Sequence, residues 1–255
     1  MALIVSIAAR KGGVAKTTTA VNLAAALGAD GAGVLLVDAD AQGQCADSLG
    51  VAPSACAGVF ADWVRGAALR DLACVVNDAP GVLLLAGDNQ SIGFEQGVSP
   101  VGLRSLAARL RAEVAALGVD YVVIDSPPRG LLQDFAILAA DLVVVPAASN
   151  RLAAQMAAET LALIDGLGVA PARLVLPVMA NRNTRDGRYW LAQIAEGFTG
   201  MLAPVAVPLA VVVAESVSAG VPLMSYAPLS PSARAYAALA REVAAVAAGA
   251  LAEVA

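Results

Sequence analysis

The chain has 255 residues, of which 59% are hydrophobic and 15% charged, and its formal net charge at pH 7 is −5. This length and apolarity allow a sizeable core and exclude a disordered chain, while the acidic balance argues against an extended basic surface for nucleic acid. The sequence contains no histidine. Any catalysis must therefore use carboxylates, lysine, arginine, backbone amides or a bound cation.

Short apolar runs alternate with longer alanine-rich segments along the chain. The runs are rich in β-branched residues and apolar throughout, which is typical of strands buried on both faces of a sheet. They cover residues 2–9, 34–40, 82–88, 119–126, 141–147 and 173–181. Helices are predicted at Thr17–Leu27, Pro100–Leu117, Gly130–Ala139, Leu152–Leu167, Gly187–Phe198 and from Ser232 to about Val254.

This alternation predicts an α/β fold with a doubly wound, mostly parallel sheet and helices on both faces. No internal repeat or linker divides the chain, so residues 1–255 are expected to form a single domain. Ala41–Gly81 is the least regular part and is expected to be an irregular excursion. The uncharged stretches on both sides of Glu215 are interrupted by prolines, which argues against a membrane-spanning helix. The N-terminal apolar run precedes its charges, unlike a secretory signal, so a cytoplasmic protein is expected.

The only two lysines lie five positions apart in "KGGVAKTT", between the first predicted strand and the first predicted helix. Gly12 and Gly13 allow a loop whose amides face an anion, and Lys16 at the start of a helix can reach phosphates. The standard pattern G-x-x-x-x-G-K-[ST] fails at Arg10 and Ala15. The methyl group of Ala15 is expected to require a negative φ. The alternative is a glycine turn that merely joins strand to helix.

Three aspartates follow predicted strands. Asp38 and Asp40 end the strand in "VLLVDADAQG", and Asp125 ends the one in "YVVIDSPP". The carboxyl ends of parallel strands face the ligand crevice of such a sheet, where a carboxylate can hold the water shell of Mg²⁺. The alternative is a solvated strand end with acidic turn residues.

Together these segments resemble the altered phosphate loop, second motif and metal-side strand of the ParA/MinD family of deviant-Walker ATPases. The later stretches "AADLVVVPAASN" and "ESVSAGVPLMSYAPLSPSARAYAALAREV" resemble that family too, so the likeness covers nearly the whole chain. The resemblance implies a P-loop NTPase fold, with ATP and Mg²⁺ as cofactors.

The resemblance also implies a role for each matching residue. Lys16 would bind phosphate in its own subunit, whereas Lys11 would cross a sandwich dimer to the partner's nucleotide. Asp40 would position the attacking water. The remaining nucleotide contacts would come from Gly12, Gly13, Val14, Ala15, Thr17 and Thr18, with Asn181 and Pro208 at adenine. The magnesium side would consist of Thr17, Asp38 and Asp125.

The function that the resemblance implies is a nucleotide switch. ATP would drive formation of a homodimer that segregates or positions DNA or a protein cargo, and a ParB-like partner would stimulate slow, Mg²⁺-dependent hydrolysis. The dimer would hold the nucleoid through non-specific DNA contacts. The alternatives are a MinD-like membrane-associated positioning ATPase and an ATP-dependent metabolic synthetase on the same scaffold.

DNA contacts are the least defined part of this expectation. Leu209 and Val212 stand where many partitioning relatives carry arginines, so other arginines would have to bind phosphate. The candidates are Arg182, Arg185 and Arg188, then Arg151, Arg173, Arg234 and Arg241. The last predicted helix is alanine-rich and ends acidic, so no membrane contact is expected. Cys45, Cys56 and Cys74 are expected to be buried or unreactive, and they precede the region where an iron–sulfur relative would bind its cluster.

Overall fold

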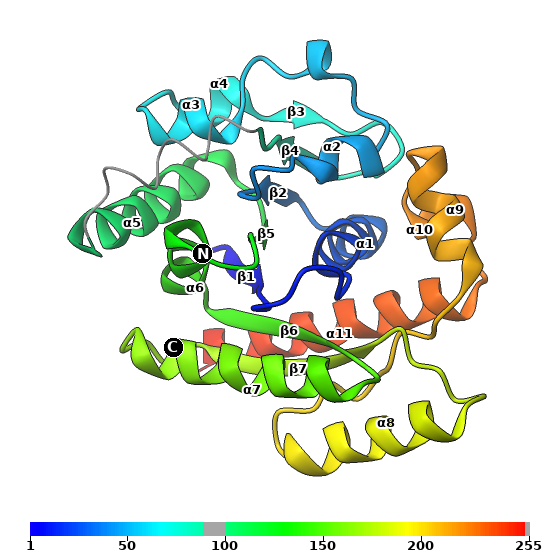
Figure 1. The fold of residues 1–255 in the computed structure, drawn as a ribbon. Helices are drawn as coiled ribbons and strands as arrows, with labels where there is room; N and C mark the ends of the chain where they lie inside the picture. Colours follow the sequence, from blue (N-terminus) through cyan, green and yellow to red (C-terminus); the bar gives the residue numbers. More distant parts are fainter. Residues whose placement is uncertain (89–99, 253–255) are drawn as a thin grey trace.

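The computed structural model describes residues 1–88 and 100–252, which build a layered α/β fold around one seven-stranded sheet (Figure 1). The strand order is β3-β4-β2-β5-β1-β6-β7, and every neighbouring pair is parallel except β3 with β4. The strands are β1 (Leu3–Ile7), β2 (Val34–Asp38), β3 (Cys74–Val75), β4 (Val82–Leu85), β5 (Tyr121–Asp125), β6 (Leu142–Ala148) and β7 (Ala172–Val178).

Helices cover both faces of the sheet (Figure 1). The longer ones are α1 (Lys16–Ala29), α5 (Pro100–Leu117), α6 (Leu131–Ala139), α7 (Arg151–Gly166), α8 (Arg185–Gly197), α9 (Val211–Ala219) and α11 (Pro231–Ala252). The short ones are α2 (Gln44–Ser48), the 3₁₀ turn Pro53–Ala55, α3 (Phe60–Val64), α4 (Leu69–Leu72) and α10 (Leu223–Tyr226).

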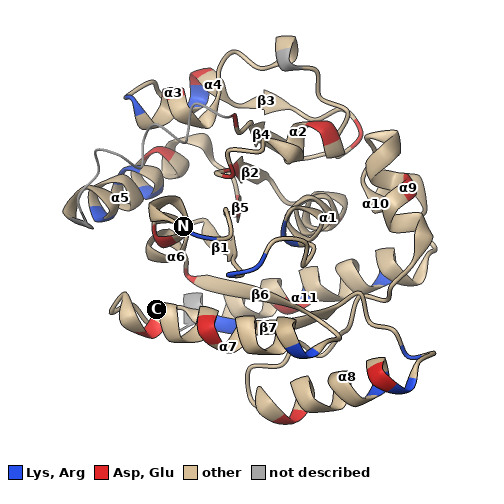
Figure 2. Ribbon diagram, in the orientation of Figure 1, with Lys and Arg blue, Asp and Glu red and all other residues tan. Residues whose placement is uncertain are grey.

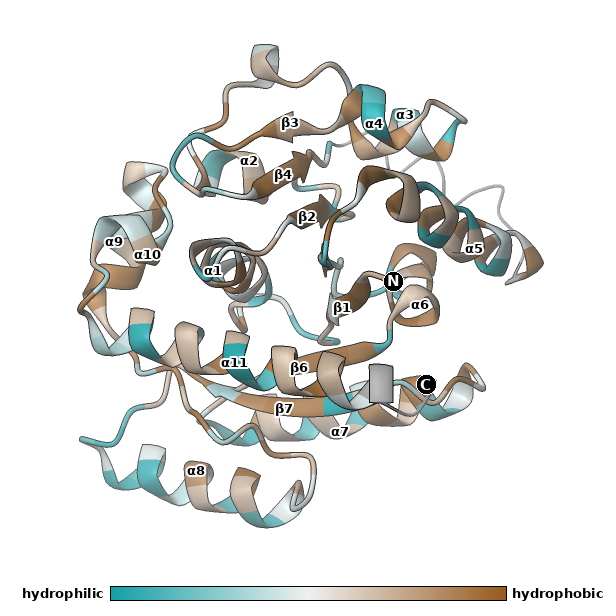
Figure 3. Ribbon diagram, turned by 180° about the vertical axis from the view of Figure 1, so that it is seen from behind, coloured by the Kyte–Doolittle hydropathy of each residue, from teal (hydrophilic) through white to brown (hydrophobic). Residues whose placement is uncertain are grey.

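The period of two in the buried strands assigns the two core layers. Leu3, Val5 and Ile7 of β1 pack in one cluster with α1 and α11, whereas Ile4 between them packs in a second cluster with α5 and α6. On the same face of the sheet as that second cluster, α7 and α8 pack against β6 and β7 in a third cluster. Figure 3 shows the consequence, with brown strands inside and teal on the outer faces of α5, α7 and α8. Burial on both faces explains why the strands are apolar throughout.

The predicted fold class is confirmed, and the six predicted strands and six predicted helices occur in the expected order. The excursion at residues 41–81 is more regular than expected, because it contains three short helices, a 3₁₀ turn and the edge strand β3. α9 and α10 were not predicted. The expected end of the last helix at Val254 lies outside the described residues.

None of the helices within residues 1–88 and 100–252 has both the length and the apolarity needed to cross a membrane.

Candidate functional site

The loop between β1 and α1 lies at the carboxyl end of the central strands. It bends through two left-handed residues, Gly13 at φ 70° and Ala15 at φ 58°. The expectation of a negative φ at Ala15 is therefore wrong. A left-handed conformation brings the methyl group of an L-residue close to the following carbonyl oxygen and costs about 1–2 kcal/mol. Ala15 is also the residue that directly precedes α1, so the strain lies where the loop becomes helix.

Lys16 is the first residue of α1 and is only 8% exposed. Its Nζ donates a hydrogen bond to the carbonyl oxygen of Lys11, 3.2 Å away. Burial lowers the pKa of Lys16, and the negative charges of Asp125 and Asp40 partly oppose this shift. Lys11 is half-buried, and its ammonium has neither a hydrogen-bond nor an ion-pair partner within residues 1–88 and 100–252. The two lysines therefore differ in environment although they lie in one loop.

A cavity of about 480 Å³ opens in front of this loop. It gathers seven of the predicted site residues: Gly12, Gly13, Ala15, Lys16, Thr17, Thr18 and Asp40. Four further lining residues were not predicted: Gln42, Gln44, Pro128 and Met179. Val14 does not line the cavity, because its side chain is 2% exposed and belongs to the core.

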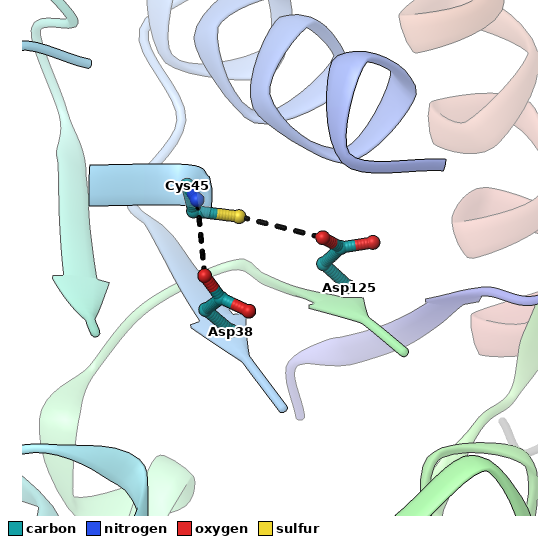
Figure 4. A group of neighbouring side chains, drawn as sticks. All are labelled: Asp38, Cys45 and Asp125. Carbon is teal, nitrogen blue, oxygen red and sulfur yellow. Dashed lines mark hydrogen bonds between the residues drawn. The ribbon is translucent and has the colours of Figure 1, made fainter. Parts of the chain in front are cut away.

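Two carboxylates meet beside the cavity. Asp38 and Asp125 are register partners at the ends of the neighbouring strands β2 and β5, and both are fully buried. The backbone amides of Asp40 and Cys45 donate to the Asp38 carboxylate at 3.1 and 3.0 Å. The thiol of Cys45 donates to Asp125 Oδ2 at 3.7 Å (Figure 4). Asp125 Oδ1 has no hydrogen-bond partner within the described residues, although it is buried.

The electrostatics of this pair favour a bound cation. Burial raises the pKa of Asp38 well above its usual range, and the neighbouring Asp125 raises it further. Burial also raises the pKa of Asp125 to about 7, although the nearby Thr17 hydroxyl and Lys16 lower it. Two adjacent carboxylates in a dry site are costly unless a positive charge joins them. The unpartnered Asp125 oxygen and the Thr17 hydroxyl are the oxygen donors that Mg²⁺ prefers, so the residues fit this ion.

Cys45 is a member of the site that the sequence did not indicate. Burial raises the pKa of its thiol well above the usual range, and the two aspartates raise it further. Its position next to Asp125 depends on a contact between residues 80 positions apart. No local pattern signals such a contact.

Asn181 and Pro208 lie together on the far side of the same depression. They line a second cavity of about 430 Å³, and Ala180 forms an isolated parallel bridge with Pro208. A third, largely apolar cavity of about 420 Å³ shares Pro208 with the second and Ala15, Thr18 and Met179 with the first. The three cavities are therefore neighbours along the surface between the glycine loop and Asn181.

Comparison with known proteins agrees with this geometry. A family model described as an AAA domain matches residues 2–168 of the chain. The chromosome-partitioning ATPase Soj of Thermus thermophilus is 36% identical over 247 residues, covering 94% of each protein. The chromosome partitioning protein ParA of Caulobacter vibrioides is 33% identical over 250 residues, covering 94% of this chain and 93% of that protein. The chain belongs to the ParA/MinD family.

A solved structure of this family shows the same fold. The septum site-determining protein MinD of Pyrococcus horikoshii, complexed with Mg-ADP, aligns with a TM-score of 0.80 at 25% identity. The alignment covers 95% of this chain and 96% of that one. The resemblance found in the sequence is thus confirmed over nearly the full length of this ParA/MinD family member.

Three of the arginines expected to face DNA lie together in this ParA/MinD family member. Arg182, Arg185 and Arg188 are exposed around the start of α8, where Figure 2 shows basic residues in blue beside an acidic one in red. Arg188 donates to the Arg182 carbonyl oxygen at 2.9 Å, and Arg182 also lines the cavity of Asn181. Of the other candidates, Arg173 forms an ion pair with Asp165 at 2.7 Å.

Proposed function

We propose that this protein is a ParA-type ATPase that uses ATP and Mg²⁺ as a switch to segregate or position DNA or a protein cargo. The observation that carries the proposal is a cavity lined by a buried lysine at a helix start, with two buried, paired carboxylates behind its wall, where Lys16 and Thr17 act on Asp125. Such a site suits a magnesium-bound polyphosphate. The relatives, two chromosome-partitioning proteins and a MinD complexed with Mg-ADP, support the same conclusion.

The roles of the residues follow from where they lie. Lys16 supplies a buried positive charge, worth more toward a phosphate than an exposed one because little water screens it. Thr17, Asp38 and Asp125 hold Mg²⁺, which neutralises phosphate charge when bound. Asp40 lies on the cavity wall, where its carboxylate orients the attacking water. The loop amides at Gly12 and Gly13 complete the anion site.

The far end of this row of cavities takes the base of the nucleotide. Asn181 offers an amide in the second cavity, and Pro208 offers an apolar surface beside it. The bridge between Ala180 and Pro208 fixes the distance between the two segments that carry these groups. We assign adenine to this end, because an amide next to an apolar wall provides both a hydrogen bond and a stacking surface.

Lys11 carries the second part of the proposal, which is dimerisation on ATP. Lys11 is half-buried in the same loop as Lys16 but does not line the cavity, and its ammonium has no partner within residues 1–88 and 100–252. We assign it to the nucleotide of a facing subunit. Both subunits then surround the same negative charge, so ATP stabilises the pair and hydrolysis weakens it.

Retention on duplex DNA of random sequence tests the positioning surface. The protein is applied with ATP, with ADP and without nucleotide, across a series of salt concentrations. We expect the protein to be retained only when ATP is present, because pairing two subunits doubles the number of contacts with DNA phosphates. A Lys16→Ala variant, which cannot bind ATP, should behave like the nucleotide-free protein.

The arginines are tested by the slope of affinity against salt. The variant Arg182→Ala/Arg185→Ala/Arg188→Ala should reduce the slope of log K against log[salt] by about 0.9 for each DNA phosphate that a subunit no longer neutralises. A matched control, Arg65→Ala/Arg70→Ala/Arg104→Ala, removes the same charge from the end of α3 and from α4 and α5. An equal reduction in both variants would show that net charge matters and this surface does not. No retention with ATP would exclude the nucleoid as the matrix.

A further inference from the structure

The cluster of Asp38, Cys45 and Asp125 contains one group that magnesium chemistry leaves unused, the Cys45 thiol. All three side chains are fully buried, and one ligand atom from each lies within 4.8 Å of the others. Figure 4 shows the thiol and the two carboxylates converging from α2, β2 and β5. Mg²⁺ takes oxygen ligands and does not recruit a thiol. A sulfur between two carboxylates is instead the donor set of a softer metal.

The spacing of these atoms fits a tetrahedral ion. In a zinc site with a metal–sulfur distance near 2.3 Å and a metal–oxygen distance near 2.1 Å, sulfur and oxygen lie about 3.6 Å apart. The thiol sulfur and Asp125 Oδ2 are 3.7 Å apart. Two oxygens of such a site lie about 3.4 Å apart. Because the ligand atoms of the cluster lie within 4.8 Å of one another, the Asp38 carboxylate has to close by at most about 1.4 Å.

A second observation indicates that this cluster can take a ligand. Asp125 Oδ1 is wholly buried without a hydrogen-bond partner in the described part of the chain, which is rare for a carboxylate oxygen. The cluster lies next to the cavity, because Lys16 and Thr17 line that cavity and both act on Asp125. The phosphate cavity is thus the side from which an ion would approach.

We propose that Asp38, Cys45 and Asp125 bind one thiophilic divalent cation, of which Zn²⁺ is the type, in competition with Mg²⁺ for the same carboxylates. The thiol releases its proton to solvent as the metal–sulfur bond forms, and water fills the fourth position. A protein loaded in this way cannot hold Mg²⁺ between Asp38 and Asp125. Zn²⁺ would thus act as an inhibitor whose effect depends on a side chain outside the phosphate loop.

Titration of the metal-free protein with Co²⁺, without nucleotide and without oxygen, tests the binding. Co²⁺ replaces Zn²⁺ in such sites and gives a thiolate-to-metal absorption band. We expect one equivalent of Co²⁺ to saturate the band. Cys45→Ser, which keeps a small polar side chain, should lose it, whereas Cys56→Ser/Cys74→Ser should keep it. The double variant is the matched control because Cys56 and Cys74 also interact with each other.

A band that survives in folded Cys45→Ser, or no band in the folded parent, would overturn the proposal. If Cys45→Ser does not fold, Cys45→Ala replaces it, and circular dichroism checks that each variant is folded.

Inhibition is measured as the hydrolysis rate with Zn²⁺ divided by each variant's own rate without it. Loss of Cys45 should raise the half-inhibiting Zn²⁺ concentration by at least about tenfold. Because the Co²⁺ titration needs no ATP, it stands or fails independently of the proposed ATPase function.

Discussion

Ala15 lies in the left-handed region at φ 58° directly before α1, and its carbonyl accepts the hydrogen bond from the Thr19 amide that begins the helix. Replacing it by glycine removes the clash of the methyl group. We expect Ala15→Gly to raise the free energy of unfolding by about 0.5–1 kcal/mol, measured by urea denaturation.

The control for this effect is an alanine in an ordinary helix. Ala158 is exposed in the middle of α7, so Ala158→Gly should lower stability by about 1 kcal/mol. Ala15→Gly and Ala158→Gly should therefore change the unfolding midpoint in opposite directions. A loss of stability in both variants would contradict the account of strain at Ala15.

Asp40 is the residue assigned to the attacking water, and its carboxylate also accepts a hydrogen bond from the Gln42 amide at 3.1 Å. We expect Asp40→Ala to reduce single-turnover ATP hydrolysis by about 10²–10⁴-fold, the usual contribution of a positioned base. ATP binding should persist, so the ATP-bound dimer should accumulate. Asp47→Ala, which removes a nearby exposed carboxylate from α2, should hydrolyse ATP at the parent rate. Equal rates in both variants would exclude Asp40 from catalysis.

Among single residues, those with a local signal were predictable and those brought in by distant contacts were not. Lys16, Thr17 and Asp38 follow from a glycine loop and a strand end, which are patterns within a few positions. The backbone of Ala15 could not be inferred, because its φ depends on how the loop closes over α1. Met179 lines two of the cavities, but only the path of the chain after β7 places it there.

At the scale of elements, length decided what the sequence revealed. Six long helices were predicted within a few residues because each spans several turns, and six strands because each is an uninterrupted apolar run. α3 and α4 have five and four residues, so neither shows a full cycle of apolar spacing. β3 has two residues and depends on its partner β4. α9 is apolar along most of its length, so no amphipathic period marks it.

One charged cluster attaches these short helices to α5. Glu113 Oε2 accepts hydrogen bonds from the Leu69 amide at 2.7 Å and from the Trp63 indole at 3.3 Å. Arg109 pairs with Glu113 at 2.6 Å and lies 5.0 Å from the centre of the Trp63 ring. Glu113→Ala removes the acceptor of three donors, the Leu69 amide, the Trp63 indole and the Arg109 guanidinium. We expect it to lower the free energy of unfolding by about 1–3 kcal/mol in thermal or urea denaturation.

The pH dependence of that effect identifies its cause. Burial raises the pKa of Glu113, but the hydrogen bonds from Leu69, Arg109 and Trp63 lower it more, so the net shift is downward. A carboxyl group whose pKa is lower in the folded state stabilises the fold above its unfolded pKa. The gap between parent and Glu113→Gln should therefore shrink as the pH falls below about 4.3. The exposed Glu196→Gln should show no such trend, and a gap that does not change with pH would refute the assignment.

For the molecule as a whole, the order of the strands builds the site. β2, β5 and β1 are neighbours, so Asp125 lies between Asp38 and the loop that follows Ile7. Three segments separated by up to 118 positions thus meet at one edge of the sheet. The sequence predicted the fold class, but it did not predict which strands are neighbours. Within this arrangement Lys16 faces inward and Lys11 remains accessible at the surface. The proposed switch follows from that difference between the two lysines.

The most direct test is the mass of the particle in solution, measured by light scattering during gel filtration. Asp40→Ala is measured with Mg-ATP, with Mg-ADP and without nucleotide, beside the double variant Asp40→Ala/Lys11→Ala. We predict twice the chain mass for Asp40→Ala with ATP only, and the single chain mass for the double variant under all three conditions, although it still binds ATP. A double variant that pairs on ATP as tightly as Asp40→Ala would contradict the account.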